Sequence, residues 1–334
     1  MRTGRRTFSL LAAALLAVFV LPGVADASPP SHDLGTPRLL TSGLQGGSGS
    51  TVGPDGALCV TEGISGELTR IDPETGEQTV VADCLPERVL GAGGAIDVAF
   101  KGRTAYVLTA LVGPGLPLPA TGVSGIYRVD GLHTCTVVAD IGAWSVEHPP
   151  STPFDVAQGL QFAIESYRDG FLVTDGHHNR VLFVQRDGDV DQLIQLPNIV
   201  PTGLDVKGSK VYLALAGPVP HLPENGRIVS FRGLSPELMD VASGAPLLLD
   251  VERCGQLLFG LAQGDFPEGS PPGSPALPNT GELRVVEDGE LELLVSGLNQ
   301  PTSLSFIGDT AYVVTLGGEV WTIAGACQVS HDDD

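Results

Sequence analysis

The residues best suited to chemistry stand in one short segment, Asp175–Val181 (Asp-Gly-His-His-Asn-Arg-Val). Imidazole titrates near neutral pH, so His177 or His178 is a candidate general base or metal ligand. A structural interpretation competes with this one. Because Asp and Asn side chains commonly hydrogen-bond turns, the segment would form a turn, with Arg180 packed between neighbouring elements and the two histidines merely exposed. The structural interpretation is favoured, and the catalytic one is kept as the alternative.

Carboxylate and amide oxygens in different parts of the chain indicate a second chemistry. Ca²⁺ prefers about six to eight oxygen ligands, and several repeats of one fold can supply them together in a central channel. No loop contains a self-contained calcium motif, and acidic residues that simply face water explain the same pattern. The candidate ligands for a Ca²⁺ cofactor, each expected near the end of an inner or second strand, are Glu62, Asp97, Asp205 and Asn299.

The long loops offer a third function, binding of a small molecule or a protein. The segments Leu111–Ala120 and Pro218–Pro223 are apolar and rich in proline. Rigid apolar loops lose little entropy on binding, although they would serve equally as a lid over the centre of the fold. The side chains expected on this ligand-binding face are Glu62, Asp175, His148, His221 and Asp265.

Several catalytic motifs are missing from the sequence. It has no Gly-x-Ser-x-Gly nucleophile turn, no phosphate-binding Gly-Lys-Ser/Thr loop and no His-Glu-x-x-His pair. The glycine-rich segment Gly91–Gly94 precedes an expected strand and not a helix, which excludes a dinucleotide fingerprint.

A repeated element must position all of these residues. A strand, a turn, a second strand, an Asp-Gly-type turn and a third strand recur, most clearly between Gly170 and Leu196. Repeats of roughly 40–50 residues built from four short strands are typical of propeller blades. The sequence therefore predicts an all-β, six-bladed β-propeller over residues 37–326. The other repeats begin near Leu58, Ala105, Val211, Gln256 and Ala311.

The two ends of this segment are predicted to close the ring. Residues 38–44 resemble residues 291–298, which form an outermost strand, yet no blade precedes them. The last blade, Pro301 to Ala324, has only three strands of its own. We therefore expect the N-terminal strand at 38–42 to pair with the C-terminal blade, because closure removes open sheet edges.

Loop length divides the predicted ring into two faces. The turns between first and second strands and between third and fourth strands are short, and they carry the Gly, Asn and Asp of tight hairpins. The loops between second and third strands and between blades are long, as at 111–124, 140–158 and 266–280. Both long classes should emerge on one side, where function is expected to concentrate.

The chain of 334 residues begins with features of a signal peptide, cleaved after Ala27. An Arg-rich start precedes the apolar run Phe8–Leu21, which is shorter than the roughly 20 residues that a spanning helix needs. Arg5-Arg6 fits either twin-arginine or ordinary secretory export. We predict a secreted protein that does not span the membrane, with a lead-in at 28–36 and an acidic tail at 327–334.

The net charge limits the possible binding partners, and the cysteine content limits the possible disulfides. The net charge of −21 disfavours nucleic acid, and a soluble monomer is expected. Five cysteines permit up to two disulfides and one free thiol in an exported protein. Cys59 is expected inside a strand as a small buried side chain. Cys84 and Cys135 border outer strands of neighbouring blades, so a bridge between them is geometrically feasible, whereas the pairing of Cys254 and Cys327 is left open.

The mature chain as a whole resembles the ScyD/ScyE group of exported propellers, which is similar to TolB-like and NHL-type six-bladed propellers. The resemblance implies a fold and a compartment but no reaction. Two departures are Cys59, where the group usually has an aromatic, and Lys207-Gly208-Ser209 in place of an Asp-Gly turn. The matching segments are Gly53–Leu58, Ala95–Phe100, Phe171–Asp175, Ile199–Leu204, Gly273–Gly281 and Gln300–Leu304.

These observations predict a ligand- or protein-binding module that uses its long-loop face. The alternative is a Ca²⁺-dependent hydrolase or lyase, because the turn at Asp175–Val181 resembles that of lactonase and streptogramin-lyase propellers. That alternative would use His177 or His178 as its base. The fold alone does not decide between the two functions, since propellers host enzymes and binding proteins alike.

Overall fold

The computed structural model describes residue 1 and residues 34–116, 121–234 and 236–328. Within these ranges the fold is almost entirely β, with 24 strands, one α-helix and two short 3-10 helices. The expected signal peptide, most of the lead-in and most of the acidic tail lie outside the described residues. Every helix in the described ranges is too short or too polar to traverse a lipid bilayer.

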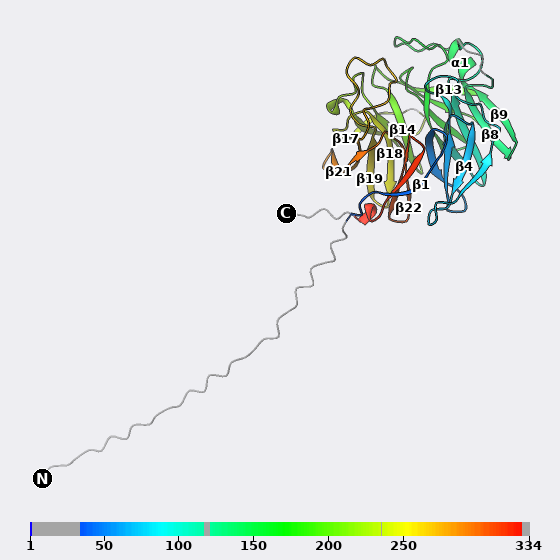
Figure 1. The fold of residues 1–334 in the computed structure, drawn as a ribbon. Coiled ribbons are helices and arrows are strands. Elements are labelled where there is room, and N and C mark those ends of the chain that lie inside the picture. Colours follow the sequence, from blue (N-terminus) through cyan, green and yellow to red (C-terminus); the bar gives the residue numbers. More distant parts are fainter. Residues whose placement is uncertain (2–33, 117–120, 235, 329–334) are drawn as a thin grey trace.

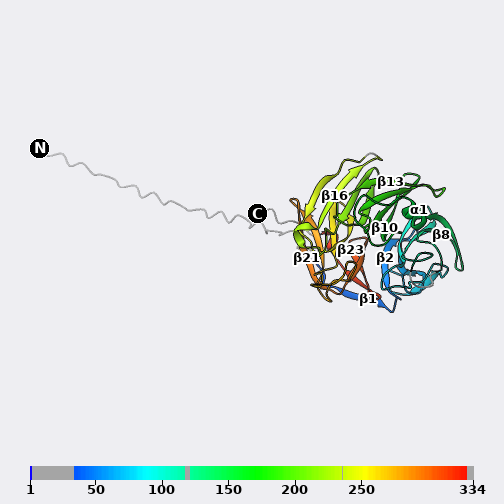
Figure 2. The same ribbon diagram turned by 90° about the horizontal axis from the view of Figure 1, so that it is seen from above.

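Four of the sheets contain four strands each, arranged around a common centre (Figures 1 and 2). The first consists of β2 (Gly47–Val52), β3 (Leu58–Glu62), β4 (Glu67–Ile71) and β5 (Gln78–Ala82). The second consists of β6 (Gly94–Lys101), β7 (Thr104–Ala110), β8 (Gly125–Gly131) and β9 (Thr134–Asp140). The third consists of β10 (Gln161–Tyr167), β11 (Gly170–Asp175), β12 (Arg180–Val184) and β13 (Val190–Gln195). The last consists of β22 (Pro301–Ile307), β23 (Thr310–Thr315), β24 (Glu319–Ile323) and β1 (Arg38–Ser42).

The remaining strands form one eight-stranded sheet, in which two four-stranded antiparallel halves meet along their outer strands. The halves are joined by a single parallel pair, Ser243 with Glu290, and the Ser243 N–H donates to Gly289 O at 3.1 Å. The sequence predicts six separate blades. In the structure the predicted fourth and fifth blades are instead joined in one sheet. The first half consists of β14 (Pro201–Lys207), β15 (Lys210–Leu215), β16 (Arg227–Arg232) and β17 (Met239–Ser243). The second half consists of β18 (Leu248–Cys254), β19 (Leu257–Ala262), β20 (Gly281–Glu287) and β21 (Glu290–Leu298).

The predicted closure of the ring is confirmed. Strand β1 pairs antiparallel with β24, with Leu39 opposite Trp321 and Ser42 opposite Glu319. The first strand of the chain is therefore the outermost strand of the last sheet, as Figure 2 shows. This pairing satisfies an edge that would otherwise present unpaired backbone groups.

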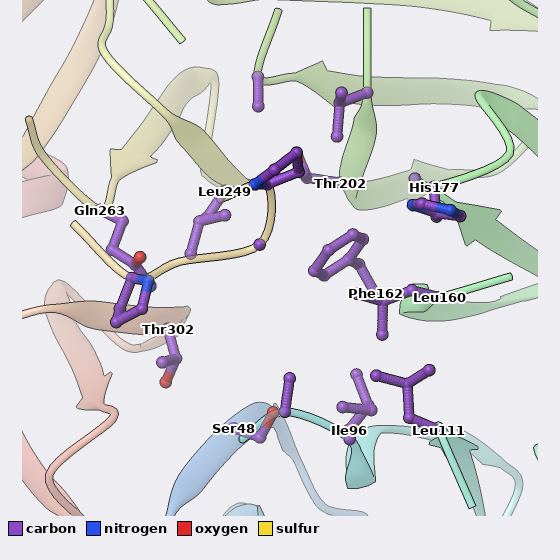
Figure 3. A pocket seen from close by; sticks show the side chains of 18 of the residues that line it. Ser48, Ile96, Leu111, Leu160, Phe162, His177, Thr202, Leu249, Gln263 and Thr302 are labelled. Carbon is purple, nitrogen blue, oxygen red and sulfur yellow. The ribbon is translucent and has the colours of Figure 1, made fainter. Parts of the chain in front are cut away.

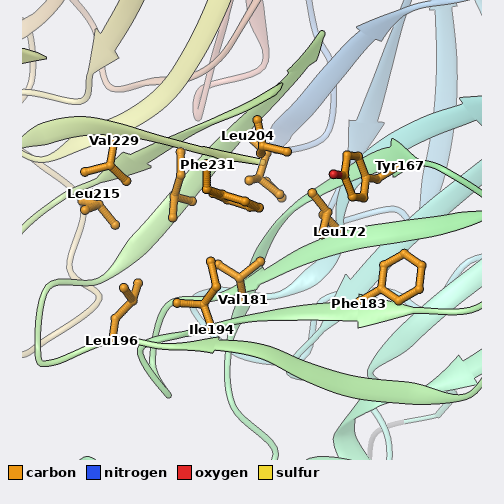
Figure 4. Packing of buried hydrophobic residues seen from close by; sticks show 13 residues of the cluster. Tyr167, Leu172, Val181, Phe183, Ile194, Leu196, Leu204, Leu215, Val229 and Phe231 are labelled. Carbon is orange, nitrogen blue, oxygen red and sulfur yellow. The ribbon is translucent and has the colours of Figure 1, made fainter. Parts of the chain in front are cut away.

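The hydrophobic core lies between neighbouring sheets. Figure 4 shows one such layer, in which Leu172 and Val181 from the third sheet face Leu204 and Phe231 from the next. All four side chains are buried. Alternation along each strand sends every second side chain into such a layer, because successive residues point to opposite faces of a sheet.

The two disulfides tie the ring together at different places. Cys84, just after β5, is bonded to Cys135 in β9 with the Cα atoms 5.7 Å apart, so the bridge that the sequence left as feasible is present between adjacent sheets. Cys254, at the end of β18, is bonded to Cys327 in the 3-10 helix η2 (Ala326–Gln328). Cys59 is a buried free thiol, and burial raises its pKa to about 11. Two disulfides are typical of proteins in an oxidising compartment.

Removing the bridge between the first two sheets should weaken the fold. Replacing both Cys84 and Cys135 by Ser is expected to lower the free energy of unfolding by roughly 2 kcal/mol, because the unfolded chain regains the freedom of a closed loop. Urea unfolding of the double variant measures this, with mass spectrometry checking that the second bridge remains intact. A midpoint equal to that of the native protein would show that the pairing of these sheets needs no covalent support.

Candidate functional site

A cavity of about 910 Å³ lies at the centre of the ring. Its walls combine the starts of the six inner strands with loops of both long classes, such as 153–156 between sheets and Val219 and His221 between β15 and β16. Both loop classes therefore emerge on one face of the ring, as the sequence predicts. Helix α1 (Ile141–Glu147) lies at this face, and the C-terminal η2 lies at the opposite one (Figure 1).

A change of register at the start of every inner strand shapes this cavity. In each of β2, β6, β10, β14, β18 and β22 the pairing with the next strand slips by one or more residues within the first four positions. Such bulges re-aim side chains and often lie beside functional sites. Each bulge contains one or two residues, and we call one residue from each of the six bulges the cavity ring; all six line the cavity (Figure 3). They are Ser48, Ile96, Phe162, Thr202, Leu249 and Thr302.

The cavity ring combines three apolar side chains with three that carry hydroxyl groups. Ile96, Phe162 and Leu249 contribute hydrocarbon side chains. The hydroxyl of Thr202 donates to Leu248 O at 2.9 Å, and that of Thr302 donates to Gly47 O at 3.2 Å, so both are already engaged with the protein. The loops above add further apolar groups to the walls, among them Leu111, Phe154, Val156, Leu160, Val219, Leu247 and Pro275.

Two carboxyl groups lie one residue further along the strands, at the inner end of the cavity. Asp97 accepts from the Ile164 N–H of the next sheet at 2.8 Å, and Asp250 accepts from the Leu304 N–H of the next sheet at 2.8 Å. Burial raises the pKa of both, that of Asp250 to about 7, and the negative charge of Asp250 raises the pKa of Asp97 further. Each carboxyl therefore links two sheets and also offers a hydrogen-bond acceptor to the cavity.

More carboxyl groups follow on the same inner strands. Burial, followed by the charges of neighbouring carboxylates, raises the pKa of Glu165 in β10 and of Glu252 in β18. Burial also raises the pKa of Asp205 in β14, although Arg253 binds its carboxylate with both Nε and Nη2 and thereby lowers it in part. The centre of the ring is thus strongly acidic, and its only ion pair among these groups is that of Asp205 within the part of the chain that the structure describes.

Close approach of two inner strands leaves no room for a side chain at Gly203. A Cβ atom on Gly203 would lie 2.6 Å from Asp250 Cα and 2.8 Å from Leu249 O. Gly203→Ala is therefore expected to lower the free energy of unfolding by about 2 kcal/mol, because neighbouring backbone must move. Gly131→Ala is the matched control, since nothing lies within 4 Å of its Cβ position. Chemical denaturation compares the two, and equal midpoints would contradict the close approach.

The two histidines occupy different surroundings. His178 is fully buried, and its Nε2 donates to Val156 O at 2.9 Å. His177 lines the cavity, but its Nε2 accepts from the backbone N–H groups of Asp155 at 2.9 Å and Val156 at 3.0 Å. Burial, followed by the nearby His178, lowers the pKa of His177. His178 is buried and His177 is half-buried, so the expectation that both histidines are merely exposed is wrong. Each ring holds protein backbone through its Nε2.

The rest of the segment forms the turn that the structural interpretation predicts. Asn179 adopts a φ of 54°, and its Oδ1 accepts from the Ile199 and Val200 N–H groups. Arg180 is fully buried and donates to Asp175 Oδ2 at 3.0 Å. The segment thus connects the third sheet to the loops on either side of it.

Of the five side chains expected on the ligand-binding face, only His221 lines the cavity. It is buried, its Nδ1 lies 2.8 Å from Gly217 O, and burial lowers its pKa. His148 is exposed at the end of α1, where it stacks on Trp144. Asp265 lies beside a smaller pocket of about 270 Å³ next to His221. Asp175 and Glu62 are buried within the protein.

The four candidate calcium ligands are not brought together. Glu62 accepts from Thr69 Oγ1 and the Gln45 N–H, Asp205 is paired with Arg253, and Asn299 is exposed between β21 and β22. Asp97 is the one of the four that lines the cavity. Among the described residues, no group of three or more His, Cys, Asp or Glu is arranged to hold a metal ion. These residues as placed do not fit a shared Ca²⁺ site.

Sequence reasoning missed the cavity ring and Asp250. A signal was present in the repeated phrase Pro201-Thr202-Gly203-Leu204 and Pro301-Thr302-Ser303-Leu304, which places a threonine at the second position of two inner strands. Of the other cavity-ring residues, Ser48 also carries a hydroxyl but Ile96, Phe162 and Leu249 do not, so the repeat does not extend around the ring. The alternation of apolar and polar residues along a strand does not show where a bulge will occur.

No protein-family model matches the chain, and no curated protein matches its sequence. Solved structures do resemble it. A gluconolactonase from Xanthomonas campestris aligns with a TM-score of 0.57 and 13% identity over 86% of this chain and 89% of its own. The PQQ-bound aldose sugar dehydrogenase of Streptomyces coelicolor aligns with a TM-score of 0.57 and 13% identity over 89% and 99%. Virginiamycin B lyase from Staphylococcus aureus aligns with a TM-score of 0.51 and 14% identity over 87% and 99%. The chain therefore has the β-propeller fold.

Proposed function

We propose that the protein is a binding module that takes a mainly apolar small molecule into its central cavity. The carrying observation is the cavity ring, in which every inner strand bulges to aim one side chain into the same 910 Å³ space. Ligand sites are typically concave, mostly apolar and equipped with a few convergent polar groups. Here Asp97 and Asp250 supply acceptors, so a ligand with a hydrogen-bond donor at its inner end suits the cavity best.

Titration with the neutral dye Nile red, followed by fluorescence, tests this proposal. Leu249→Arg places a long cationic side chain in the cavity ring and is expected to weaken dye binding by roughly tenfold or more. Leu293→Arg is the matched control, because Leu293 lies on an outer strand and is 49% exposed. Binding that is equally strong in both variants, or no saturable binding to the native protein, would contradict a cavity site.

A hydrolase or lyase is the second candidate. It is favoured by one observation, the presence of Asp97 and Asp250 in the same cavity with the pKa of Asp250 raised to about 7, which suits a general base at neutral pH. The neighbouring structures include a gluconolactonase and a virginiamycin B lyase, which supports the same class. The hydrogen bonds of His177 and His178 make these carboxyls better candidates for proton transfer than the two histidines.

Assays against a panel of lactones and cyclic peptides, with and without added Ca²⁺, separate the enzyme from the binding module. The enzyme predicts turnover that falls at least about a hundredfold in Asp250→Asn. The binding module predicts saturable binding without turnover. Turnover that requires Ca²⁺ and persists in Asp250→Asn would support a Ca²⁺-dependent hydrolase or lyase instead.

Three finer assignments accompany the proposed function. We count each half of the eight-stranded sheet as one blade, because both have four antiparallel strands in the order of the other sheets, and the propeller then has six blades. Export fits the two disulfides. Membership of the ScyD/ScyE group remains a proposal, based on the sequence segments that resemble it.

A further inference from the structure

The loop between α1 and β10 contains a short strap, residues 152–156, at the mouth of the cavity. Pro153, Phe154, Asp155 and Val156 all line the cavity, and Phe154 is 40% exposed. The strap is therefore both a wall of the proposed ligand site and a surface segment. The contacts that hold the strap in place therefore also determine the shape of the ligand site.

The adjacent His177 and His178 hold this strap. His177 Nε2 accepts from the Asp155 and Val156 N–H groups, and His178 Nε2 donates to Val156 O. The Thr152 hydroxyl donates to His178 O at 3.3 Å. Phe154 packs edge-on against the His178 ring, with ring centroids 5.1 Å apart. The two imidazoles thus form hydrogen bonds with both the N–H and the C=O of one residue, Val156.

The chemistry of these bonds fixes which ring nitrogen accepts from the strap and which one donates to it. A nitrogen that accepts two backbone N–H groups must carry its lone pair, so the proton of neutral His177 sits on Nδ1. Because a carbonyl oxygen only accepts, His178 Nε2 carries a proton toward Val156 O, while its Nδ1 lies 2.8 Å from Arg180 Nη2 and 3.1 Å from Asp175 Oδ2. Protonation of His177 would place a proton on Nε2. This nitrogen would then be a donor facing the N–H groups of Asp155 and Val156, and both hydrogen bonds would be lost.

We propose that His177 is a pH-sensitive latch, which holds the strap against the cavity mouth while it is neutral and releases the strap when it is protonated. This inference rests on the proposed function for its purpose, since it regulates access to the same cavity. The geometry of the latch is independent of whether anything binds there.

The neighbouring charges set the pH range. Burial, followed by His178, disfavours the charged form of His177, whereas Asp175 and Asp155 favour it, and the net result is a pKa lowered from its ordinary value. A histidine whose folded pKa is lowered contributes stability that is complete above its unfolded pKa of about 6.5 and is lost as the pH falls through the folded value. The strap should accordingly be held at neutral pH and released in acid.

Amide hydrogen exchange of the intact, disulfide-bonded protein without ligand tests the latch. Between about pH 8 and about pH 5, the protection factors of the Asp155 and Val156 amides are expected to fall by roughly tenfold, after correction for intrinsic exchange. NMR titration of the His177 ring should show the same midpoint. Unchanged protection, or a ring that titrates without any change at the strap, would overturn the proposal.

Two variants sharpen the test. His177→Gln places a non-titrating oxygen near the position of Nε2, so strap protection should lose its pH dependence. His133→Gln is the matched control, because His133 is exposed and its ring contacts Asp83 and not the strap. A pH response in His177→Gln as large as that of the native protein would overturn the latch. Since no ligand is present, that outcome leaves the cavity-binding proposal intact, whereas failed Nile red binding leaves the latch intact.

Discussion

Replacing Arg180 by Ala is expected to lower the free energy of unfolding by roughly 3–5 kcal/mol. The guanidinium is fully buried, and it donates to Asp175 Oδ2 at 3.0 Å, Ser145 Oγ at 2.8 Å and His148 O at 2.8 Å. Its loss would leave the buried Asp175 carboxylate without a countercharge. It would also release α1 and the start of the strap loop from the third sheet.

Urea unfolding with a matched variant measures this effect. Arg186→Ala removes an exposed guanidinium from the turn after β12 and should change the free energy of unfolding by less than about 0.5 kcal/mol. Adding Asp175→Asn to Arg180→Ala should recover part of the loss, because the uncompensated charge is then gone. A loss below about 1 kcal/mol in the single variant would mean that water replaces the guanidinium.

The carboxyl groups at the centre of the ring should make the protein less stable as the pH rises. Asp250 has a pKa raised by burial from 3.8 to about 7. Between those two values the folded protein holds a proton that the unfolded chain has released, so the free energy of unfolding decreases with increasing pH and then levels off. For Asp250 alone the decrease is roughly 2–4 kcal/mol. The raised pKa values of Asp97, Glu165 and Glu252 act in the same direction.

Denaturation at a series of pH values between about 4 and 8 tests this, with the native protein compared to Asp250→Asn. The variant cannot ionise at this position, so its stability should vary less across the range, even though Asn keeps only one of the two acceptor oxygens. Glu292→Gln, on an exposed position of β21, should retain the native slope. Native stability that rises steadily from pH 4 to pH 7 would contradict the raised pKa values.

Much of the fold follows from local sequence pattern. Alternating apolar residues such as Leu172 and Val181 predict strands, and Asp-Gly turns predict the hairpins between them. The likeness between residues 38–44 and 291–298 even predicts the closure by β1. The contact between Ser243 and Glu290 is different, because it depends on how close two outer strands come after folding and not on the sequence of either.

The site was less predictable than the fold. Long loops correctly indicate the functional face, yet the residues that reach the cavity are placed by bulges and by the packing of sheets far apart in sequence. Asp97 was expected to bind a metal with other partners, and Asp250 looks like an ordinary strand residue until the ring brings the two near each other. His177 and His178 attract attention as neighbours in sequence, but only the structure shows that one lines the cavity and the other is buried.

The pairing of β1 with β24 imposes an order on biosynthesis. The strand that completes the last sheet leaves the ribosome first, and about 280 residues separate Ser42 from the start of β24. Domains made during translation usually fold from the N-terminus onward, but this ring cannot shut until its final strands exist. We expect the nascent chain to carry open sheet edges until β24 has been made, which makes chaperone protection of the growing polypeptide valuable.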